Sequence, residues 1–85
     1  MSADDVITLI ADSKKFLEPY RAYGKMITDG VGQLDSLEKL VRGGLFPEAY
    51  RMSVSMCGQI SNYRAFVPKL VENLEKIRDM LKVLS

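Results

Sequence analysis

The chain has 85 residues, which is enough for one domain and too few for two. Its 12 Lys and Arg residues nearly balance its 11 Asp and Glu residues, so a formal charge of +1 does not favour nucleic acid or an anionic membrane as a partner. One cysteine and no histidine exclude an internal disulfide and argue against a zinc site.

The N-terminal stretch MSADDVITLIADSKKF places acidic residues before a short apolar run. A Sec signal peptide has a basic segment first, so we expect no such signal here. No apolar run approaches the roughly 18 residues that a membrane span requires, and we expect no membrane insertion. Ser2 followed three residues later by Asp5 predicts a capping box at the start of a helix.

The first half of the chain predicts a helix over about residues 3–42. Apolar residues recur at alternating steps of three and four, which is the spacing of one helix face. A second apolar row runs beside the first at seven-residue intervals and widens this face. The first row is Ile10, Ser13, Leu17, Tyr20, Gly24, Ile27, Val31 and Leu34, with Val41 seven residues further on, and the second is Leu9, Phe16, Tyr23, Gly30 and Leu37.

Residues 43–46 predict a tight turn at the middle of the chain. Gly43 and Gly44 suit the left-handed conformation that ends helices, and Pro47 suits the first turn of a following helix. Leu45 and Phe46 place two large apolar side chains at this tip. Two interpretations stay open for them: a hydrophobic staple across the turn, or a tip that another protein recognises.

The second half predicts a helix over about residues 47–84, with the same apolar rhythm and no skip. A short connection makes the two helices antiparallel neighbours. We therefore expect an all-α fold, a single domain built as an antiparallel two-helix hairpin with a central tight turn. Each helix of roughly 38 residues would be about 57 Å long.

Pro19 and Pro68 lie inside the two helical patterns. Each removes an amide donor and clashes with the carbonyl one turn earlier, at a cost of about 3 kcal/mol in a helix interior. In a hairpin that turns near residue 44, the two prolines fall at matching heights. They either kink both helices together, or Pro19 starts a new helix and makes three in all.

The apolar faces are wider than a single hairpin contact requires, so we expect a second hairpin to pack here and complete a four-helix bundle. This partner is either an identical chain, giving a homodimer, or a different helical hairpin, giving a heterodimer. The predicted partner interface comprises Leu9, Phe16, Tyr23, Leu37, Met52, Met56, Ile60, Tyr63, Phe66, Leu70, Leu74 and Ile77.

No pattern of catalytic, cofactor-binding or metal-binding residues emerges, so we do not expect an enzyme. The commonest general base is missing because the chain has no histidine. Cys57 sits beside the apolar seam, and we interpret it as a buried structural thiol. The glycine-containing stretch GKMITDGVG lacks the spacing and the preceding strand of a phosphate-binding loop.

The central stretch GGLFPEAY resembles the turn of the WXG-type, Esx-like small proteins of type VII secretion. Phe46 stands where that family has its tryptophan, and Ala49 and Tyr50 resemble the continuation after the turn; Glu48 replaces the motif glycine. The resemblance implies a dimerising helical hairpin that is cytoplasmic before export and leaves the cell without a Sec signal. No Tyr-x-x-x-Asp/Glu export signal is present, which implies a partner chain that carries one.

The resemblance predicts a dimerising substrate or a partner that covers the helical N-terminal region of an LXG-type effector. Two alternatives belong to other classes. One is a structural subunit of a secretion apparatus, such as a type III needle protein, which polymerises head to tail. The other is a small cytoplasmic regulatory or immunity module that binds one dedicated partner.

Overall fold

A computed structural model describes residues 2–85 and is helical throughout, with no strand in that range. Its elements are α1 (Ala3–Leu17), the 3-10 helix η1 (Glu18–Tyr23), α2 (Lys25–Arg42), α3 (Phe46–Ile60), the 3-10 helix η2 (Ser61–Tyr63) and α4 (Pro68–Leu84). The predicted all-α class is confirmed. The two long helices are not observed, because each is divided in two.

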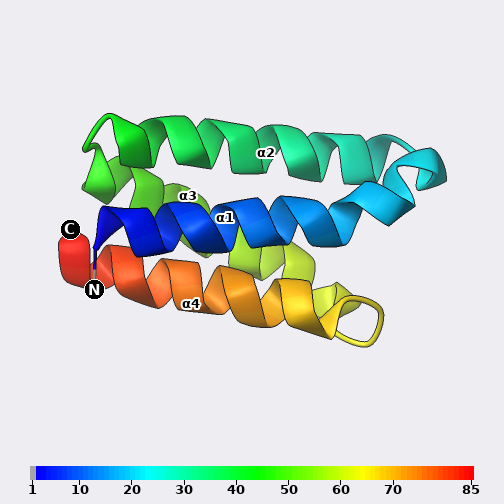
Figure 1. Cartoon of the computed structure of the whole chain (residues 1–85). Coiled ribbons are helices and arrows are strands. Elements are labelled where there is room, and N and C mark those ends of the chain that lie inside the picture. The colour runs from blue at the N-terminus through cyan, green and yellow to red at the C-terminus, as the bar shows by residue number, and fades with distance from the viewer. Residues whose placement is uncertain (1) are drawn as a thin grey trace.

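The four α-helices of the described chain form an up-down-up-down bundle (Figure 1). α1 contacts α2 and α4, and α3 also contacts α2 and α4, so each helix has two neighbours. The N- and C-termini lie at one end of the bundle, with the turn between α2 and α3 (Figure 1). Both 3-10 helices lie at the other end, which we call the hinge end. The molecule measures 33 × 20 × 18 Å.

The start of α1 has the predicted capping box. The Asp5 amide donates a hydrogen bond to the Ser2 hydroxyl at 3.4 Å, and the Ser2 amide donates to the Asp5 carboxylate at 3.1 Å. Each side chain thus satisfies a backbone donor that has no partner within the helix.

The first helix pattern breaks at Pro19, which corrects the continuous helix expected over about 3–42. Pro19 has no amide to donate to the Lys15 carbonyl, and α1 ends two residues before it, at Leu17. The chain continues as η1 and then changes direction at Gly24, where φ is 120° and ψ is −169°. This backbone region is essentially confined to glycine, so Gly24 is what allows α2 to run back along α1.

The second helix pattern breaks at Pro68, which corrects the continuous helix expected over about 47–84. Pro68 disfavours helical dihedrals in the residue before it, and Val67 has φ −133° and ψ 61°. Pro68 itself is the first residue of α4, where its missing amide costs nothing. Neither proline is a kink within a continuous helix: α1 ends at Leu17 before Pro19, and α3 has already ended at Ile60 when Pro68 begins α4. The alternative of a single new helix at Pro19 accounts for the first break and not the second.

The turn between α2 and α3 is as tight as the sequence predicts. Gly44 has a φ of 74°, and its amide donates a hydrogen bond to the Val41 carbonyl at 3.0 Å. The Leu45 amide donates to the Leu40 carbonyl at 2.9 Å, which completes a Schellman motif. α3 begins at Phe46, one residue earlier than expected.

The core lies along the axis of the bundle and takes side chains from all four helices. Ser13 and Ser53 are buried within it, and their hydroxyls donate to the Leu9 and Tyr50 carbonyls at 2.8 and 2.7 Å. The buried apolar cluster comprises Val6, Ile10, Leu17, Leu34, Leu37, Val41, Ala49, Met56, Cys57, Leu70, Leu74, Ile77 and Leu81. The chain thus covers much of its apolar seam with its own helices, because the two breaks let it fold back on itself.

Candidate functional site

The structure divides the predicted partner interface into three groups. Five members, Leu37, Met56, Leu70, Leu74 and Ile77, are buried in the core of the single chain. Leu9, Met52, Ile60 and Tyr63 are half-buried, while Phe16 and Phe66 are exposed. Tyr23 lies outside the side chains that the structure describes. Four of the accessible members lie at the hinge end: Phe16, Ile60, Tyr63 and Phe66.

An open groove of about 1020 Å³ lies at the hinge end, and we call it the end groove. Its floor is apolar and is formed by core side chains that are themselves almost fully buried. These are Leu17, Leu34, Met56, Leu70 and Leu74. Its sides are formed by Tyr20, Met26, Ile27, Gly30, Ile60, Tyr63, Phe66 and Val67, and its polar edge by Lys25, Asp29, Gln33, Gln59 and Asn62.

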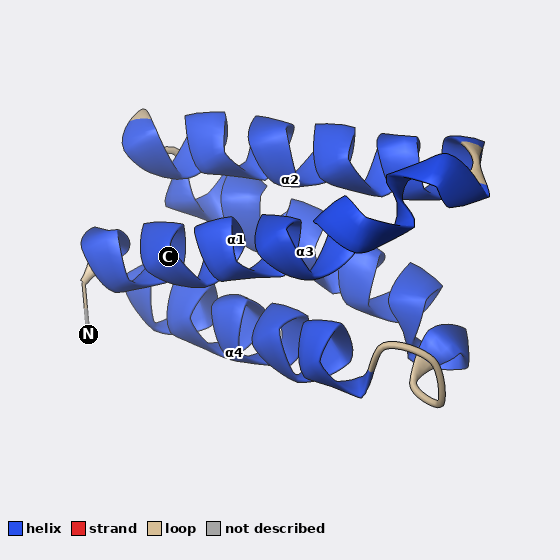
Figure 2. Ribbon diagram, turned by 45° about the vertical axis from the view of Figure 1, so that its right-hand side comes forward, coloured by secondary structure: helices blue, strands red, loops and turns tan. Residues whose placement is uncertain are grey.

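The end groove is open because α3 diverges from α2. The two helices lie together at their connecting turn, and α3 then inclines away from α2 toward the start of α4 (Figures 1 and 2). At the hinge end, α1 stops at Leu17 and α4 begins only at Pro68, so no helix fills the space between α2 and α3. Met26 and Phe66 are left 60% and 78% exposed at its margin.

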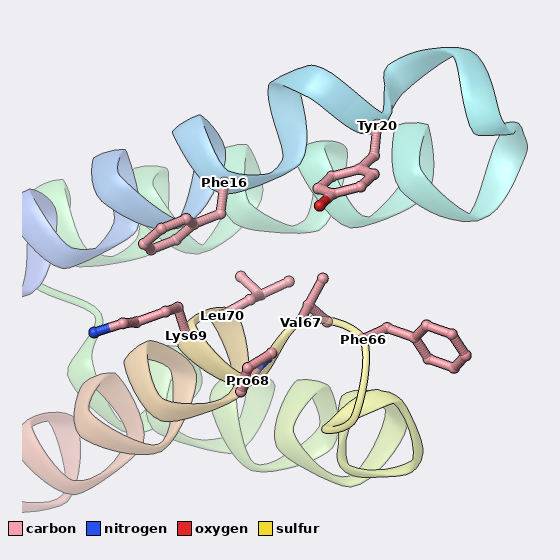
Figure 3. A pocket seen from close by; sticks show the side chains of 7 residues that line it. All are labelled: Phe16, Tyr20, Phe66, Val67, Pro68, Lys69 and Leu70. Atoms are coloured by element: carbon pink, nitrogen blue, oxygen red, sulfur yellow. The ribbon is translucent and has the colours of Figure 1, made fainter.

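A smaller pocket of about 170 Å³ adjoins the end groove between η1 and the start of α4. The rings of Phe16 and Tyr20 extend from above toward the segment that contains Val67 and Leu70, while Phe66 points away from it (Figure 3). Tyr20, Phe66, Val67 and Leu70 line both spaces. The two therefore form one apolar surface with aromatic residues along its margin.

The charges around this surface are of both signs. Arg64 pairs with Glu75 at 3.0 Å, and Arg21 pairs with Glu18 at 3.5 Å, so these four groups largely neutralise one another. Asp29 and two lysines remain at the edges of the two spaces: Lys25 and Asp29 line the end groove, and Lys69 lines the smaller pocket. The surface thus combines an apolar floor with a sparsely charged edge.

Cys57 is buried in α3, as the sequence predicts. Burial raises the pKa of its thiol, although the nearby Arg78 guanidinium lowers it. A thiol with a raised pKa is a poor nucleophile because little thiolate is present at neutral pH. Within residues 2–85, no three side chains of the types that bind metals come together, and no helix has both the length and the apolar character of a membrane span.

We compared the chain with protein-family models, curated proteins and solved structures. None of them matches it. The end groove is therefore interpreted from its own geometry and chemistry.

The four turn residues divide between the core and the surface. Phe46 packs against the core, whereas Leu45 remains exposed at the tip beside Gly43 and Gly44. Sequence reasoning did not predict the groove itself, nor the roles of Ile27, Gln59 and Val67 in it. The one signal that pointed there was the placement of Pro19 and Pro68 at matching heights, which marks where the bundle stays open.

Proposed function

We propose that this chain is a non-enzymatic binding module whose end groove receives an amphipathic helix from a partner protein. The observation that carries the proposal is a groove between two diverging helices, in which the exposed apolar side chains of Tyr20, Met26 and Phe66 surround a floor of core side chains. Monomeric proteins rarely leave a large contiguous apolar surface uncovered unless something binds there.

The dimensions favour a helix over a small molecule. At about 1020 Å³, the end groove lies at the upper limit of pockets for small ligands, and it is an open groove between helices. An added helix between α2 and α3 would pack as the existing helices do, with axes about 8–10 Å apart. Helix-in-groove recognition uses apolar residues at positions i, i+3, i+4 and i+7 of the bound helix.

The residues at the margin suit this role. Met26 at the margin and Met56 in the floor are flexible and polarisable, so they adapt to side chains of different shape. Phe66 and Tyr63 offer aromatic area of the kind enriched at protein interfaces. Lys25 and Asp29 lie one turn apart on α2 and carry opposite charges, so the bound helix would carry charges of both signs beside its apolar face.

A narrower form of the proposal gives the bound helix to a protein exported by type VII secretion. The resemblance of GGLFPEAY to the WXG-type turn supports this form. The chain would then act as a cytoplasmic partner for the helical N-terminal region of an effector and leave the cell with it. The closed bundle would serve this role through its groove, whereas the dimerising substrate of the sequence-based prediction uses the whole apolar seam.

The test is a selection from a displayed library of helical peptides on the immobilised protein. We expect the enriched peptides to share large apolar residues at i, i+3, i+4 and i+7. Met26→Lys and Ile60→Asp should each weaken their binding at least about tenfold, because each places a charge against the apolar face. Val83→Lys, at a side chain that is 71% exposed near the opposite end of the bundle, is the matched control.

Enriched peptides without an apolar stripe would contradict the proposal, and so would binding that Met26→Lys and Val83→Lys reduce equally. Circular dichroism and thermal unfolding of each variant separate loss of binding from loss of the fold.

A further inference from the structure

Both breaks between helices lie at the same end of the bundle, and the apolar rhythm runs through each of them. On one side Leu17, Tyr20 and Ile27 stay in step across η1. On the other, Ile60, Tyr63 and Leu70 stay in step across η2. A loop that only reverses the chain does not require its apolar residues to keep helical spacing. The sequence is therefore also compatible with one continuous helix from α1 through α2 and another from α3 through α4.

The backbone of the breaks is already close to helical. Glu18 has φ −51° and ψ −50°, and Ser61 and Arg64 have φ −56° with ψ near −32° and −33°. Gly24 and Val67 depart clearly from helical dihedrals, and residues 64–66 between η2 and Val67 form a turn. Rotation about the backbone at these two residues would therefore straighten much of each break, and the two act as hinges.

The contacts of the bundle divide at these hinges. We call α2 and α3 the turn pair, because the turn at residues 43–45 joins them, and α1 and α4 the terminal pair. The helices within each pair contact one another. When both hinges open, α1 continues into α2 and α3 into α4, so the chain becomes one long hairpin. The contacts within each pair remain. The contacts of α1 with α2 and of α3 with α4 are broken, so the two pairs lie at opposite ends of the hairpin.

We propose that a second copy of this chain restores the broken contacts, giving a domain-swapped dimer. The turn pair of each copy packs against the terminal pair of the other, with the hinges at a two-fold axis. The occupant is a second copy because its terminal pair presents the same face that the first chain's own terminal pair presents in the closed form. This inference goes beyond the proposed function and does not depend on it.

The exposed side chains of the hinge end support the same occupant. Met26 and Phe66 project from the hinge end of the closed chain. In the dimer the hinge ends of the two lobes meet at the axis, so these side chains are covered. The dimer would therefore close the end groove, and the groove would be open in the monomer.

Two features of the hinges set the balance between the forms. Gly24 holds a conformation that side chains disfavour, and any other residue there would strain the closed chain. Pro68 acts in the opposite way, because it disfavours the helical conformation that Val67 needs in the open form. The closed form prevails in dilute solution because its contacts are intramolecular.

The first experiment asks whether contacts pass between chains. Equal amounts of ¹⁵N-labelled and unlabelled protein are unfolded together and refolded at high protein concentration, and dimer and monomer are separated by size-exclusion chromatography with light scattering. A carbodiimide then joins the Lys14 amine to the carboxylate of Glu38, whose oxygen lies 3.0 Å away across α1 and α2. We expect mixed-isotope Lys14–Glu38 links in the dimer and single-isotope links in the monomer. A dimer with single-isotope links alone would overturn the proposal.

The second experiment uses the hinges. Gly24→Ala should lower the dimer dissociation constant about 100-fold, from about tenfold for each of the two chains that carry the substitution. Gly32→Ala is the matched control, because Gly32 lies within α2 with open space around it. Pro68→Ala should also favour the dimer, and provides a second variant should Gly24→Ala fold poorly. Monomers for both hinge variants at millimolar concentration, or an equal shift with Gly32→Ala, would overturn the proposal.

Discussion

The Lys14 ammonium of α1 donates a hydrogen bond to the Glu38 carboxylate of α2 at 3.0 Å and also pairs with Asp35. Glu38 in turn accepts a hydrogen bond from Arg42 at 3.0 Å. These hydrogen bonds lower the pKa of the Asp35 carboxyl and that of the Glu38 carboxyl from their ordinary values. The pKa of Lys14 is raised, mainly by its hydrogen bond to Asp35. The cluster ties together two helices that a glycine hinge joins.

Replacing Lys14 with Met tests this cluster through its pH dependence. A carboxyl group with a lowered pKa stabilises the fold at neutral pH, and that contribution disappears as the pH falls through its folded pKa. We expect the wild type to lose stability from about pH 5 downward. Lys14→Met should lose less, because Asp35 and Glu38 then titrate nearer their ordinary values.

The measurement is urea unfolding of both proteins at about pH 7 and about pH 3.5. Lys76→Met removes the charge of an exposed lysine on α4, away from the contact between α1 and α2, and serves as the control. Identical pH dependence in Lys14→Met and the wild type would show that the cluster does not couple to folding.

Ile77 tests whether the apolar seam serves the single chain. Its side chain is completely buried among the four helices, so Ile77→Ala leaves a cavity and should lower the free energy of unfolding by about 2–5 kcal/mol. Because small domains are only marginally stable, this is a large share of the total. Val83→Ala, at an exposed position of the same helix, should change it by less than about 0.5 kcal/mol.

Both values come from urea unfolding followed by circular dichroism at low protein concentration. A normal monomer stability for Ile77→Ala, together with weakened association, would instead assign Ile77 to an interface between chains.

Local chemistry explains which features the sequence predicted. The capping box of Ser2 and the central glycines act within a few residues, so their positions follow directly from residue type. The helix faces were also predictable, because residues such as Ile10 and Leu81 recur at helical spacing and are buried. These patterns identify which side of a helix is buried and carry no information on what covers it.

The number of helices depends on a competition that the local pattern does not contain. A continuous helix through Pro19 or Pro68 costs about 3 kcal/mol and leaves its apolar face exposed until a partner arrives. A break at each proline allows the chain to bury that face immediately. The same spacing of apolar residues fits a continuous helix that packs against a partner and a broken helix that folds back on its own chain. The end groove was unpredictable for a related reason, since it depends on the angle at which α3 leaves α2.

Gly44 and Gly32 provide a prediction in which the same substitution has opposite effects. Gly44 has a φ of 74° in the Schellman motif, so Gly44→Ala should destabilise the fold by about 1 kcal/mol. Gly32 lies in the middle of α2, and a methyl group added to its Cα would extend into open space. Gly32→Ala should therefore stabilise the fold by about 0.5–1 kcal/mol.

Thermal unfolding of the two variants beside the wild type is the measurement. The two shifts in melting temperature should have opposite signs. Shifts of the same sign would contradict the turn geometry, because alanine would then be equally acceptable at both positions.

Cys57 reports on how α3 and α4 open. Its thiol is buried, and burial raises its pKa, so both access and thiolate formation limit its reaction. We expect iodoacetamide at about pH 8 to modify Cys57 in the folded protein at least about 100-fold more slowly than in concentrated guanidinium, because reaction must wait for an opening of the fold. Mass spectrometry of quenched samples gives the rates.

The matched control places a thiol on the same helix where no opening is required. Val54 is exposed on α3, so the thiol of a Val54→Cys, Cys57→Ala variant should react in the folded protein at nearly its unfolded rate. If Cys57 reacts as quickly as that exposed thiol, the contact between α3 and α4 opens readily in solution. The seam would then be accessible to a partner along its whole length and not at the end groove alone.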